Sequence, residues 1–284
     1  MDPNFNELLE KSMEIWLSED IGNGDHTTLS TIPADSKGKA KLLVKDEGII
    51  AGIFVVEKLI QKFDEDLSME VFIEDGSKIH HGDIALEMQG PVQSILQIER
   101  LVLNLLQRLS GIATQTDKYV GELKGTKTRI LDTRKTTPGL RFLEKEAVRL
   151  GGGVNHRTGL FHMVLIKDNH IDFSGGIEKA IQKAKIYLEK NKLDLKIEVE
   201  ARNLEDVERI LKAGNVDRIL LDNFTPELTV QAVKMIDGMA ETESSGGIGL
   251  ETLKDYAECG VDYISVGALT HQIRSLDLSL KAIY

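Results

Sequence analysis

The sequence has very little cysteine and no long apolar run. Its 284 residues include a single cysteine, Cys259, which excludes an intrachain disulfide and a cluster of thiolate metal ligands. No stretch approaches the roughly 18 uncharged apolar residues of a membrane-spanning helix. Residues 1–10 lack the basic and apolar regions of a signal peptide. We therefore expect a cytoplasmic protein without a membrane partner.

Basic and aromatic residues are also in the minority. The chain has 35 Lys and Arg against 46 Asp and Glu, a formal charge of −11 at pH 7, and only 5% aromatic residues. This composition argues against nucleic acid as a partner, because proteins that bind nucleic acid concentrate basic charge. With 41% hydrophobic and 29% charged residues, the chain is ordinary for a globular protein and long enough for two modest domains.

One basic window is the exception to this acidity. Residues 127–168 hold nine Lys and Arg against four Asp and Glu, so the window carries +5 and the remainder of the chain −16. Five basic residues fall within one strand-helix unit and the strand that follows it: Arg134, Lys135, His156, Arg157 and Lys167. Because a guanidinium can hold flat carboxylates and phosphates bidentately, this window predicts a pocket for an anion.

The first third of the chain predicts a small α+β sandwich domain. Apolar residues near helical spacing predict a helix over residues 5–20, and short alternating segments within 38–53 and 69–89 predict a mostly antiparallel sheet. Residues 91–107 predict a strongly apolar helix that is buried on more than one side. We expect Arg100, in the middle of this helix, to be buried and to need an anionic partner.

From residue 129 onward, predicted strands alternate with predicted helices. The strands are 129–133, 163–167, 196–200, 218–222, 241–245 and 263–267, and the helices are 139–150, 175–190, 204–213, 226–237 and 250–258. Strands joined by helical crossovers make a parallel sheet. Six strands are fewer than the eight of a standard barrel, so we predict an α/β fold: an incomplete parallel α/β barrel with an N-terminal α+β sandwich domain. The predicted domains are residues 1–110, joined by the tail 271–284, and residues 111–270.

Each predicted strand ends in polar residues or glycines. They are Asp132, Arg134 and Lys135; Lys167 and Asp168; Glu198 and Glu200; Asp222 and Asn223; Ser245, Gly246 and Gly247; and Gly267 and Ala268. The carboxyl edge of a parallel sheet is where ligands bind. The turns at 245–247 and 267–269 each precede a helix, which suits a phosphate monoester. Glu200 and Asp222 would then face sugar hydroxyls or a magnesium ion on a pyrophosphate, with salt bridges to the basic residues as the alternative.

Three segments carry a family resemblance. DTRKTTPGLR at 132–141, GGGVNHR at 151–157 and LIKDNHI at 165–171 closely resemble the signature of the quinolinate phosphoribosyltransferases, the decarboxylating enzymes of NAD biosynthesis. The resemblance extends from EDIGNGDHTT at 19–28 to GAL at 267–269. It implies an open α/β barrel as the catalytic domain. The implied reaction transfers phosphoribosyl from phosphoribosyl pyrophosphate to quinolinate, giving nicotinate mononucleotide, carbon dioxide and pyrophosphate.

The resemblance also implies roles for individual residues. The two quinolinate carboxylates would meet Arg134, Lys135, His156, Arg157 and Lys167, together with Arg100 from a second subunit. Lys135, Lys167, Glu200 and Asp222 would be the catalytic residues, and substrate contacts would extend to Thr133, Ser245, Gly246, Gly247, Gly267, Ala268 and Leu269. The resemblance implies Mg²⁺ bound to the pyrophosphate donor near Glu200 and Asp222, without a dedicated protein metal site. It also implies a homodimer, with a trimer of dimers as the larger alternative.

Other functions remain open from the residues alone. A Schiff-base aldolase on the same kind of barrel would use Lys135 or Lys167 as its amine, which requires a pKa depressed by a desolvated pocket. A sensor of phosphorylated metabolites would bind the same ligands without turnover. Within the family, a paralogue associated with molybdenum metabolism has a related sequence, and the combination of the TRK, HR and KDNH segments favours the quinolinate enzyme over it.

Overall fold

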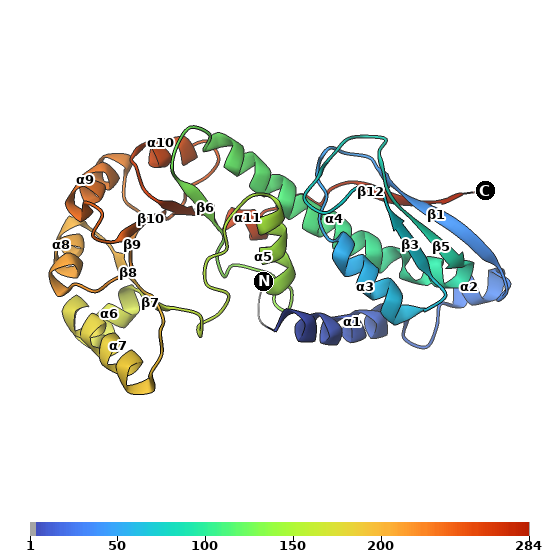
Figure 1. The fold of residues 1–284 in the computed structure, drawn as a ribbon, viewed down its shortest axis with the longest axis horizontal. Helices are drawn as coiled ribbons and strands as arrows, with labels where there is room; N and C mark the ends of the chain where they lie inside the picture. Colours follow the sequence, from blue (N-terminus) through green and yellow to red (C-terminus); the bar gives the residue numbers. More distant parts are fainter. Residues whose placement is uncertain (1–3, 284) are drawn as a thin grey trace. The chain divides into compact units, whose positions relative to one another are not determined.

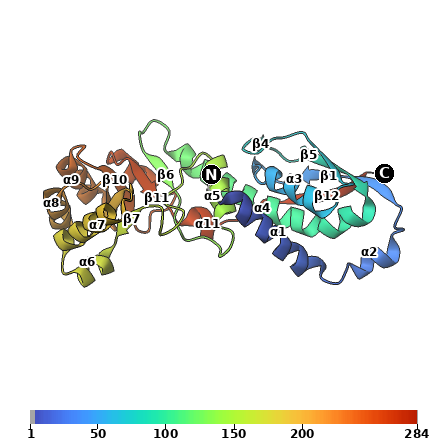
Figure 2. The same ribbon diagram turned by 60° about the horizontal axis from the view of Figure 1, so that its bottom comes forward.

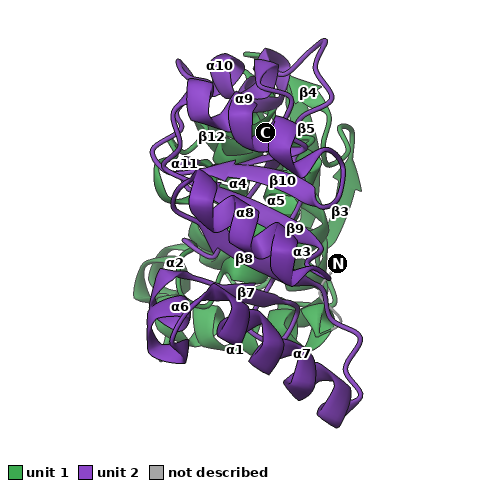
Figure 3. Ribbon diagram, turned by 90° about the vertical axis from the view of Figure 1, so that its left-hand side faces the viewer, with its two compact units in different colours: residues 1–117, 136–152, 269–284 green, residues 118–135, 153–268 purple. Residues whose placement is uncertain are grey.

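The structure is a computed structural model and describes residues 4–283. The chain divides into two compact units, coloured separately in Figure 3. Unit 1 consists of residues 1–117, 136–152 and 269–284, and unit 2 consists of residues 118–135 and 153–268. Residues 136–152, which fall inside the predicted domain 111–270, therefore group in space with unit 1.

Unit 1 contains a four-stranded antiparallel sheet with the strand order β12-β1-β5-β3. Its strands are β1 (Lys37–Val44), β3 (Ser68–Val71), β5 (Ile84–Pro91) and β12 (Leu278–Ile283). The short strands β2 (Gly48–Ile49) and β4 (Lys78–Ile79) pair separately. Strand β12 pairs with β1 along its length, so residues from the far end of the sequence complete a sheet formed by the first hundred residues.

Several helices complete the described part of unit 1. They are α1 (Phe5–Ile21), α2 (His26–Thr31), α3 (Ile53–Phe63), α5 (Arg141–Leu150) and most of α4 (Val92–Glu122), and the short α11 (Ala268–His271) begins at the unit boundary. Helix α3 begins where the Asp75 carboxylate accepts hydrogen bonds from the backbone N–H groups of Gly52, Ile53 and Phe54 at 2.7–3.0 Å. This carboxylate satisfies donors that the first turn of a helix leaves unpaired. Figure 2 shows α1 running alongside α4.

Helix α4 is longer than the predicted helix 91–107. It continues to Glu122 through Ser110, Gly111 and Thr114, residue types that ordinarily weaken a helix. In this helix they make tertiary contacts instead. The Ser110 hydroxyl accepts a hydrogen bond from the Ala51 N–H at 3.0 Å, and the Thr114 hydroxyl accepts one from the Ile49 N–H at 2.9 Å. Packing against the β2 segment therefore overrides local helix propensity.

Unit 2 contains a six-stranded parallel sheet with the order β6-β11-β10-β9-β8-β7. The strands are β6 (Arg129–Leu131), β7 (Val164–Ile166), β8 (Ile197–Ala201), β9 (Arg218–Asp222), β10 (Glu241–Ser245) and β11 (Tyr263–Ser265). Strands β6 and β7 are the two edges and do not pair with each other, so the sheet is open. The predicted incomplete parallel barrel is confirmed, and β9 and β10 have the predicted bounds.

The helices that follow these strands cover the outer face of the sheet. They are α6 (Asp168–Ser174), α7 (Ile177–Asn191), α8 (Leu204–Ala213), α9 (Pro226–Ile236) and α10 (Leu253–Glu258). Figure 1 shows α7, α8 and α9 outside the strands, which leaves the inner face for other side chains. Helix α6 was not predicted. Its first residues, beginning with Asp168, are the charged and polar residues that end the LIKDNH segment. Within residues 4–283, no helix combines the length and the apolar character that a membrane crossing needs.

Candidate active site

Asp132, directly after β6, anchors the segment that carries His156 and Arg157. Its side chain is fully buried. One carboxylate oxygen accepts a hydrogen bond from the His156 backbone N–H at 2.8 Å, and the other accepts one from the Asn155 side chain at 2.8 Å. The β6 end thereby fixes the start of the predicted HR segment at the carboxyl edge of the sheet.

The positive residues next to this anchor lie close to one another. Burial and the charge of Arg134 both lower the pKa of the Arg157 guanidinium, so the two guanidinium groups repel each other. The Arg157 Nη1 donates a hydrogen bond to the Met163 carbonyl at 3.2 Å, and within residues 4–283 no carboxylate forms an ion pair with Arg157. Thr133 accepts a hydrogen bond from the exposed Lys135 backbone at 3.0 Å. Two guanidinium groups that repel each other favour the binding of an anion.

The ends of β7 and β8 place a cation beside a carboxylate. The Lys167 ammonium lies 3.6 Å from the Glu200 Oε2, and the Asp168 N–H donates to the Glu200 Oε1 at 3.3 Å. Burial raises the pKa of the Glu200 carboxyl, Lys167 lowers it and the charge of Asp222 raises it again. Glu200 and Asp222, from neighbouring strands, therefore lie close enough to repel each other, while Lys167 partly compensates.

The ends of β9 and β10 form a tightly packed turn. The Ser245 hydroxyl donates to the Asp222 Oδ1 at 2.6 Å, the Asn223 amide donates to the Asp222 Oδ2 at 2.7 Å, and the Asn223 N–H donates to the Ser245 carbonyl at 2.9 Å. Gly246 has a φ of +96°, and a Cβ at this position would collide with the Asn223 side chain. Glycine is therefore required here both for the backbone conformation and for the close approach.

The remaining predicted site residues lie in several places. Gly247 continues the β10 turn with a φ of +63°. Gly267 and Ala268 follow β11 at the edge of unit 2, and Leu269, whose side chain is fully buried, already groups with unit 1. Arg100 belongs to unit 1 and is exposed, so the expectation that it is buried is wrong. The long helix α4 exposes one face at this position.

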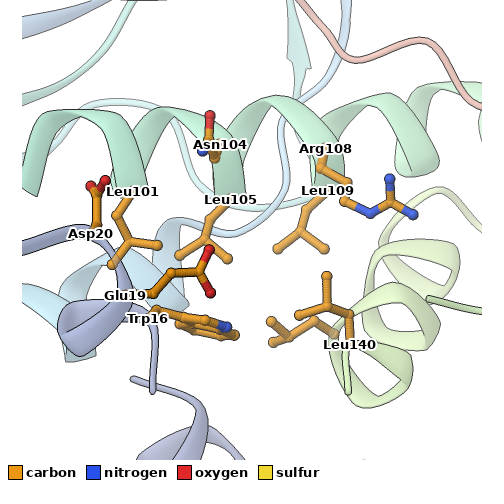
Figure 4. A pocket seen from close by; sticks show the side chains of 10 residues that line it. Trp16, Glu19, Asp20, Leu101, Asn104, Leu105, Arg108, Leu109 and Leu140 are labelled. Carbon is orange, nitrogen blue, oxygen red and sulfur yellow. The ribbon is translucent and has the colours of Figure 1, made fainter. Parts of the chain in front are cut away.

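A second arginine of α4 has the acidic partner that we expected for Arg100. Arg108 donates to the fully buried Glu144 Oε1 at 2.6 and 3.0 Å, and to the Thr137 hydroxyl at 2.7 Å. Arg108 also lines a cavity of about 230 Å³ in unit 1, between α1, α4 and the start of α5. Figure 4 shows Trp16 and Leu140 facing Leu105 and Leu109 across it. Leucines and Trp16 dominate its lining, and none of the predicted site residues is among them.

A buried ionic cluster on the inner face of the unit 2 sheet was not predicted. The His156 Nε2 lies 3.0 Å from the Glu198 Oε2 and 3.4 Å from the Glu243 Oε2. The Arg218 Nη1 lies 2.9 Å from the same Glu243 oxygen, and its guanidinium stacks on the Tyr263 ring at 4.2 Å. The sequence predicts Glu198 at a strand end and does not single out Glu243; in the structure both lie within their strands. The alternation of glutamates in IEVE and ETES, within otherwise buried strands, was the signal that these carboxylates share the inner face.

Burial and mutual charge shift the protonation of this cluster. Burial, together with the charge of Glu243, raises the pKa of Glu198 to about 7. Burial lowers the pKa of the His156 ring, and the nearby carboxylates of Glu198 and Glu243 raise it. The Arg157 N–H donates to Nδ1 and thereby opposes protonation of that nitrogen, so this geometry keeps the ring neutral with its proton on Nε2. Because His156 and Glu198 share one contact, the proton taken up belongs to the pair.

Two groups of carboxylates could be considered for a metal ion. One oxygen each of Glu198 and Glu243 and a nitrogen of His156 lie within 4.8 Å of one another, but the Arg218 guanidinium already supplies positive charge there. Glu200 and Asp222, at the strand ends, offer hard oxygen atoms whose repulsion a cation would relieve. The second pair fits a Mg²⁺ ion that arrives with a pyrophosphate.

The fold and this site define a class: an α/β enzyme whose open parallel sheet carries cationic and carboxylate side chains at its carboxyl edge. The family descriptions "Quinolinate phosphoribosyl transferase, N-terminal domain" and "Quinolinate phosphoribosyl transferase, C-terminal domain" match residues 25–110 and 112–281. The chain belongs to the quinolinate phosphoribosyltransferase family.

Individual relatives agree with this assignment. The chain is 44% identical to a Nicotiana glauca protein named quinolinate phosphoribosyltransferase [decarboxylating] 2, mitochondrial, over 96% of this chain and 82% of that protein. It is 43% identical to a Bacillus subtilis protein named probable nicotinate-nucleotide pyrophosphorylase [carboxylating], over 96% and 92%. The structure of the nicotinate-nucleotide pyrophosphorylase from Francisella tularensis superimposes with a TM-score of 0.91 at 38% identity, covering 98% of this chain and 97% of that one.

Proposed function

We propose that this chain transfers phosphoribosyl from phosphoribosyl pyrophosphate to quinolinate with decarboxylation, a step of NAD biosynthesis. The products are nicotinate mononucleotide, carbon dioxide and pyrophosphate. The observation that carries this proposal is that Arg134 and Arg157, near the carboxyl edge of the sheet, are near enough for their charges to repel each other, in a chain that belongs to the family. Quinolinate carries two carboxylates, and adjacent guanidinium groups oppose such charges.

Each substrate then has its own part of the edge. Arg134, Lys135, Arg157 and Lys167 supply positive charge for quinolinate; His156 belongs to the same part of the edge, and Thr133 directly precedes Arg134 in the sequence. Glu200 and Asp222 face the ribose hydroxyls. The 5′-phosphate binds to the backbone of two segments. The first contains Ser245, Gly246 and Gly247, and the second contains Gly267, Ala268 and Leu269.

Transfer requires positioning rather than a protein nucleophile. The quinolinate nitrogen forms a bond to the anomeric carbon of the ribose while the bond from that carbon to pyrophosphate breaks, through an oxocarbenium-like state. Preorganised charges such as those of Lys135, Lys167, Glu200 and Asp222 stabilise the charge that develops there. The carboxylate next to the ring nitrogen then leaves as carbon dioxide. Its bonding electrons are stabilised by the positively charged nitrogen until the ring carbon takes up a proton.

Mg²⁺ accompanies the pyrophosphate donor in this proposal. When bound, the ion neutralises pyrophosphate oxygens and thereby helps pyrophosphate to leave. Glu200 and Asp222 lie on the side of the site where it would sit, and their mutual repulsion supports a cation there. Addition of excess chelator should abolish turnover, and restoring Mg²⁺ should recover it; full activity in chelator would contradict this part of the proposal.

The complete site requires two subunits in this proposal. Arg100 is exposed on α4 and has no ion pair within residues 4–283, so its charge is available to a neighbouring molecule. We assign it to the quinolinate pocket of the adjoining subunit in a homodimer, with three such dimers forming a hexamer as the alternative. We also assign the protein to the cytoplasm, although the Nicotiana glauca relative is named as mitochondrial.

A turnover assay tests the proposed reaction directly. Purified protein, phosphoribosyl pyrophosphate, Mg²⁺ and quinolinate should yield nicotinate mononucleotide and an equal amount of carbon dioxide, while nicotinate in place of quinolinate should yield little product. Absence of nicotinate mononucleotide under these conditions would overturn the proposal. The aldolase alternative loses support because the Lys167 ammonium is half-exposed and lies 3.6 Å from the Glu200 carboxylate, whereas a Schiff-base amine requires a desolvated pocket.

A further inference from the structure

The chain itself occupies both nitrogens of the His156 ring. Nδ1 lies 2.7 Å from the Arg157 backbone nitrogen, which donates a hydrogen bond to it. Nε2 lies 3.0 Å from the Glu198 Oε2 and 3.4 Å from the Glu243 Oε2, and the side chain is only 8% exposed. A ring whose two nitrogens both face chain atoms has no N–H group to offer to a substrate carboxylate.

These contacts define the tautomer of the ring. A backbone N–H is always a donor, so Nδ1 must accept from Arg157 and the ring proton must lie on Nε2. Glu198 and Glu243 stand at Nε2 and favour a proton there, as carboxylates do when they orient other functional histidines. The two glutamates therefore direct Nδ1, with its lone pair, toward Arg157.

The glutamates are fixed in turn. The Arg218 Nη1 holds Glu243 at 2.9 Å, and the Arg218 Nη2 lies 3.0 Å from Glu241. Stacking of the guanidinium on Tyr263 limits its movement further. Glu198 and Glu243 are fully buried, so both have little freedom to leave the ring. The contacts run in one order: Arg218 to Glu243, Glu243 and Glu198 to His156, and His156 to the Arg157 backbone.

Arg157 is the member of this series that reaches the proposed pocket. Its side chain is close to Arg134, which repels it, and its Nη1 is held by the Met163 carbonyl. A guanidinium that is repelled by its neighbour keeps its position only if the backbone beneath it is fixed. The hydrogen bond from the Arg157 N–H to His156 is one such restraint, and the bond from the His156 N–H to Asp132 is another.

We propose that His156 is a positioning residue for Arg157 rather than a ligand of the substrate, and that Glu198, Glu243 and Arg218 act on the pocket through His156. This inference deepens the proposed function and rests on it. His156 still belongs to the site, but loss of its ring weakens quinolinate binding because Arg157 is displaced.

A double-mutant cycle separates the two roles. Quinolinate binding is measured by calorimetry in wild-type protein, His156→Ala, Arg157→Ala and the double mutant, so that no variant needs to turn over. We expect His156→Ala to weaken binding about tenfold in the wild-type background and by less than about twofold when Arg157 is already Ala. A loss of about tenfold in both backgrounds would show that the ring contacts the substrate itself and would overturn the inference.

A milder variant guards against misfolding of His156→Ala. Glu243→Gln keeps the shape of the side chain and removes its charge. We expect this variant to raise the KM for quinolinate about threefold and to leave the KM for phosphoribosyl pyrophosphate within about twofold. In the Arg157→Ala background it should have no further effect on quinolinate binding. Equal increases in both KM values would indicate a general loosening of the sheet and would refute the positioning role. Wild-type protein that neither binds nor converts quinolinate would refute the proposed function instead.

Discussion

Two guanidinium groups close to one another, those of Arg134 and Arg157, dominate the site at the scale of single residues. Proteins tolerate such repulsion where a ligand later relieves it. Arg157 is the more restrained of the two, because it is largely buried and held by Met163. Because Arg157 is held in place, its substitution is the more decisive test of the proposed pocket for the quinolinate carboxylates.

Replacing Arg157 or Lys135 by Ala should reduce kcat/KM for quinolinate by about tenfold to a hundredfold, because each loses one charge-assisted contact worth roughly 1.5–3 kcal/mol. Steady-state kinetics on both variants measures this effect. Lys190→Ala, at an exposed position near the end of α7, is the matched control and should behave as wild type. Wild-type kcat/KM in either site variant would remove that residue from the pocket.

The buried cluster should make folding stability depend on pH. Glu198 has an unperturbed pKa of 4.5, and burial beside Glu243 raises the pKa to about 7 in the folded chain. The folded state therefore binds more protons than the unfolded state between about pH 4.5 and 7. The free energy of unfolding should consequently fall as the pH rises through this range.

The variant Glu198→Gln isolates this contribution. We expect its free energy of unfolding, measured by urea denaturation, to fall less between pH 5 and pH 8.5 than that of the wild type. Glu178→Gln is the control: Arg209 lowers the pKa of the exposed Glu178 to about 2, so its contribution is complete above pH 4.5 and is lost only as the pH falls toward 2. An unchanged wild-type slope in Glu198→Gln would contradict the proposed proton uptake.

At the scale of elements, α4 contains two glycines with opposite surroundings. A Cβ on Gly111 would collide with the Arg274 carbonyl and lie 3.2 Å from Ser275, whereas a Cβ on Gly121 would meet nothing within 4 Å. The first glycine lets the segment after α11 cross the helix closely. The second only adds flexibility to the unfolded chain.

Alanine at these two positions should therefore act in opposite directions. Gly111→Ala should destabilise the protein by about 1–3 kcal/mol, because the crossing segment must move. Gly121→Ala should be neutral or stabilise it by up to about 1 kcal/mol, since alanine favours the helix. Thermal unfolding of both variants compares them on the same helix; equal destabilisation would mean that the close crossing has no energetic role.

The elements also show which features the sequence reveals. Strands β9 and β10 were predicted to the residue because apolar residues and clear turn signals bound them. The extension of α4 beyond residue 107 was not predicted, because Ser110 and Thr114 are used for contacts with distant backbone rather than for local helix formation. No local pattern in the sequence predicts hydrogen bonds to backbone groups that are distant along the chain.

The same limit applies to the site. Lys167, Glu200, Asp222 and Ser245 lie at or next to the carboxyl ends of their strands, so a parallel sheet brings them to one edge, and sequence order was sufficient to list them. The pairing of His156 with Glu198 and Glu243 depends instead on the depth to which one side chain enters the sheet. Depth is a property of the three-dimensional path of residues 153–163, which periodicity does not encode.

At the scale of the whole molecule, the proposed sharing of Arg100 between subunits predicts complementation. Arg100→Ala and Lys167→Ala should each be inactive alone. After mixing, denaturation and refolding, about half the dimers should be mixed, and each mixed dimer should contain one site with both wild-type residues, giving up to about a quarter of wild-type sites. The measurement is formation of nicotinate mononucleotide by the refolded mixture.

The control is a mixture shown by differential tagging to contain mixed dimers. If such a mixture is no more active than the separate variants, Arg100 serves its own subunit. Refolded wild-type protein carried through the same procedure gives the recovery against which the quarter is measured.

The pairing of β12 with β1 has a consequence for synthesis. The ribosome makes β1 early, yet its neighbour β12 is translated only after every strand of unit 2. Until then one side of β1 lacks its partner, and an unpaired strand edge invites association with other chains. The nascent first unit must therefore wait for the second, and chains truncated before residue 278 should be found with chaperones or in aggregates rather than as free protein.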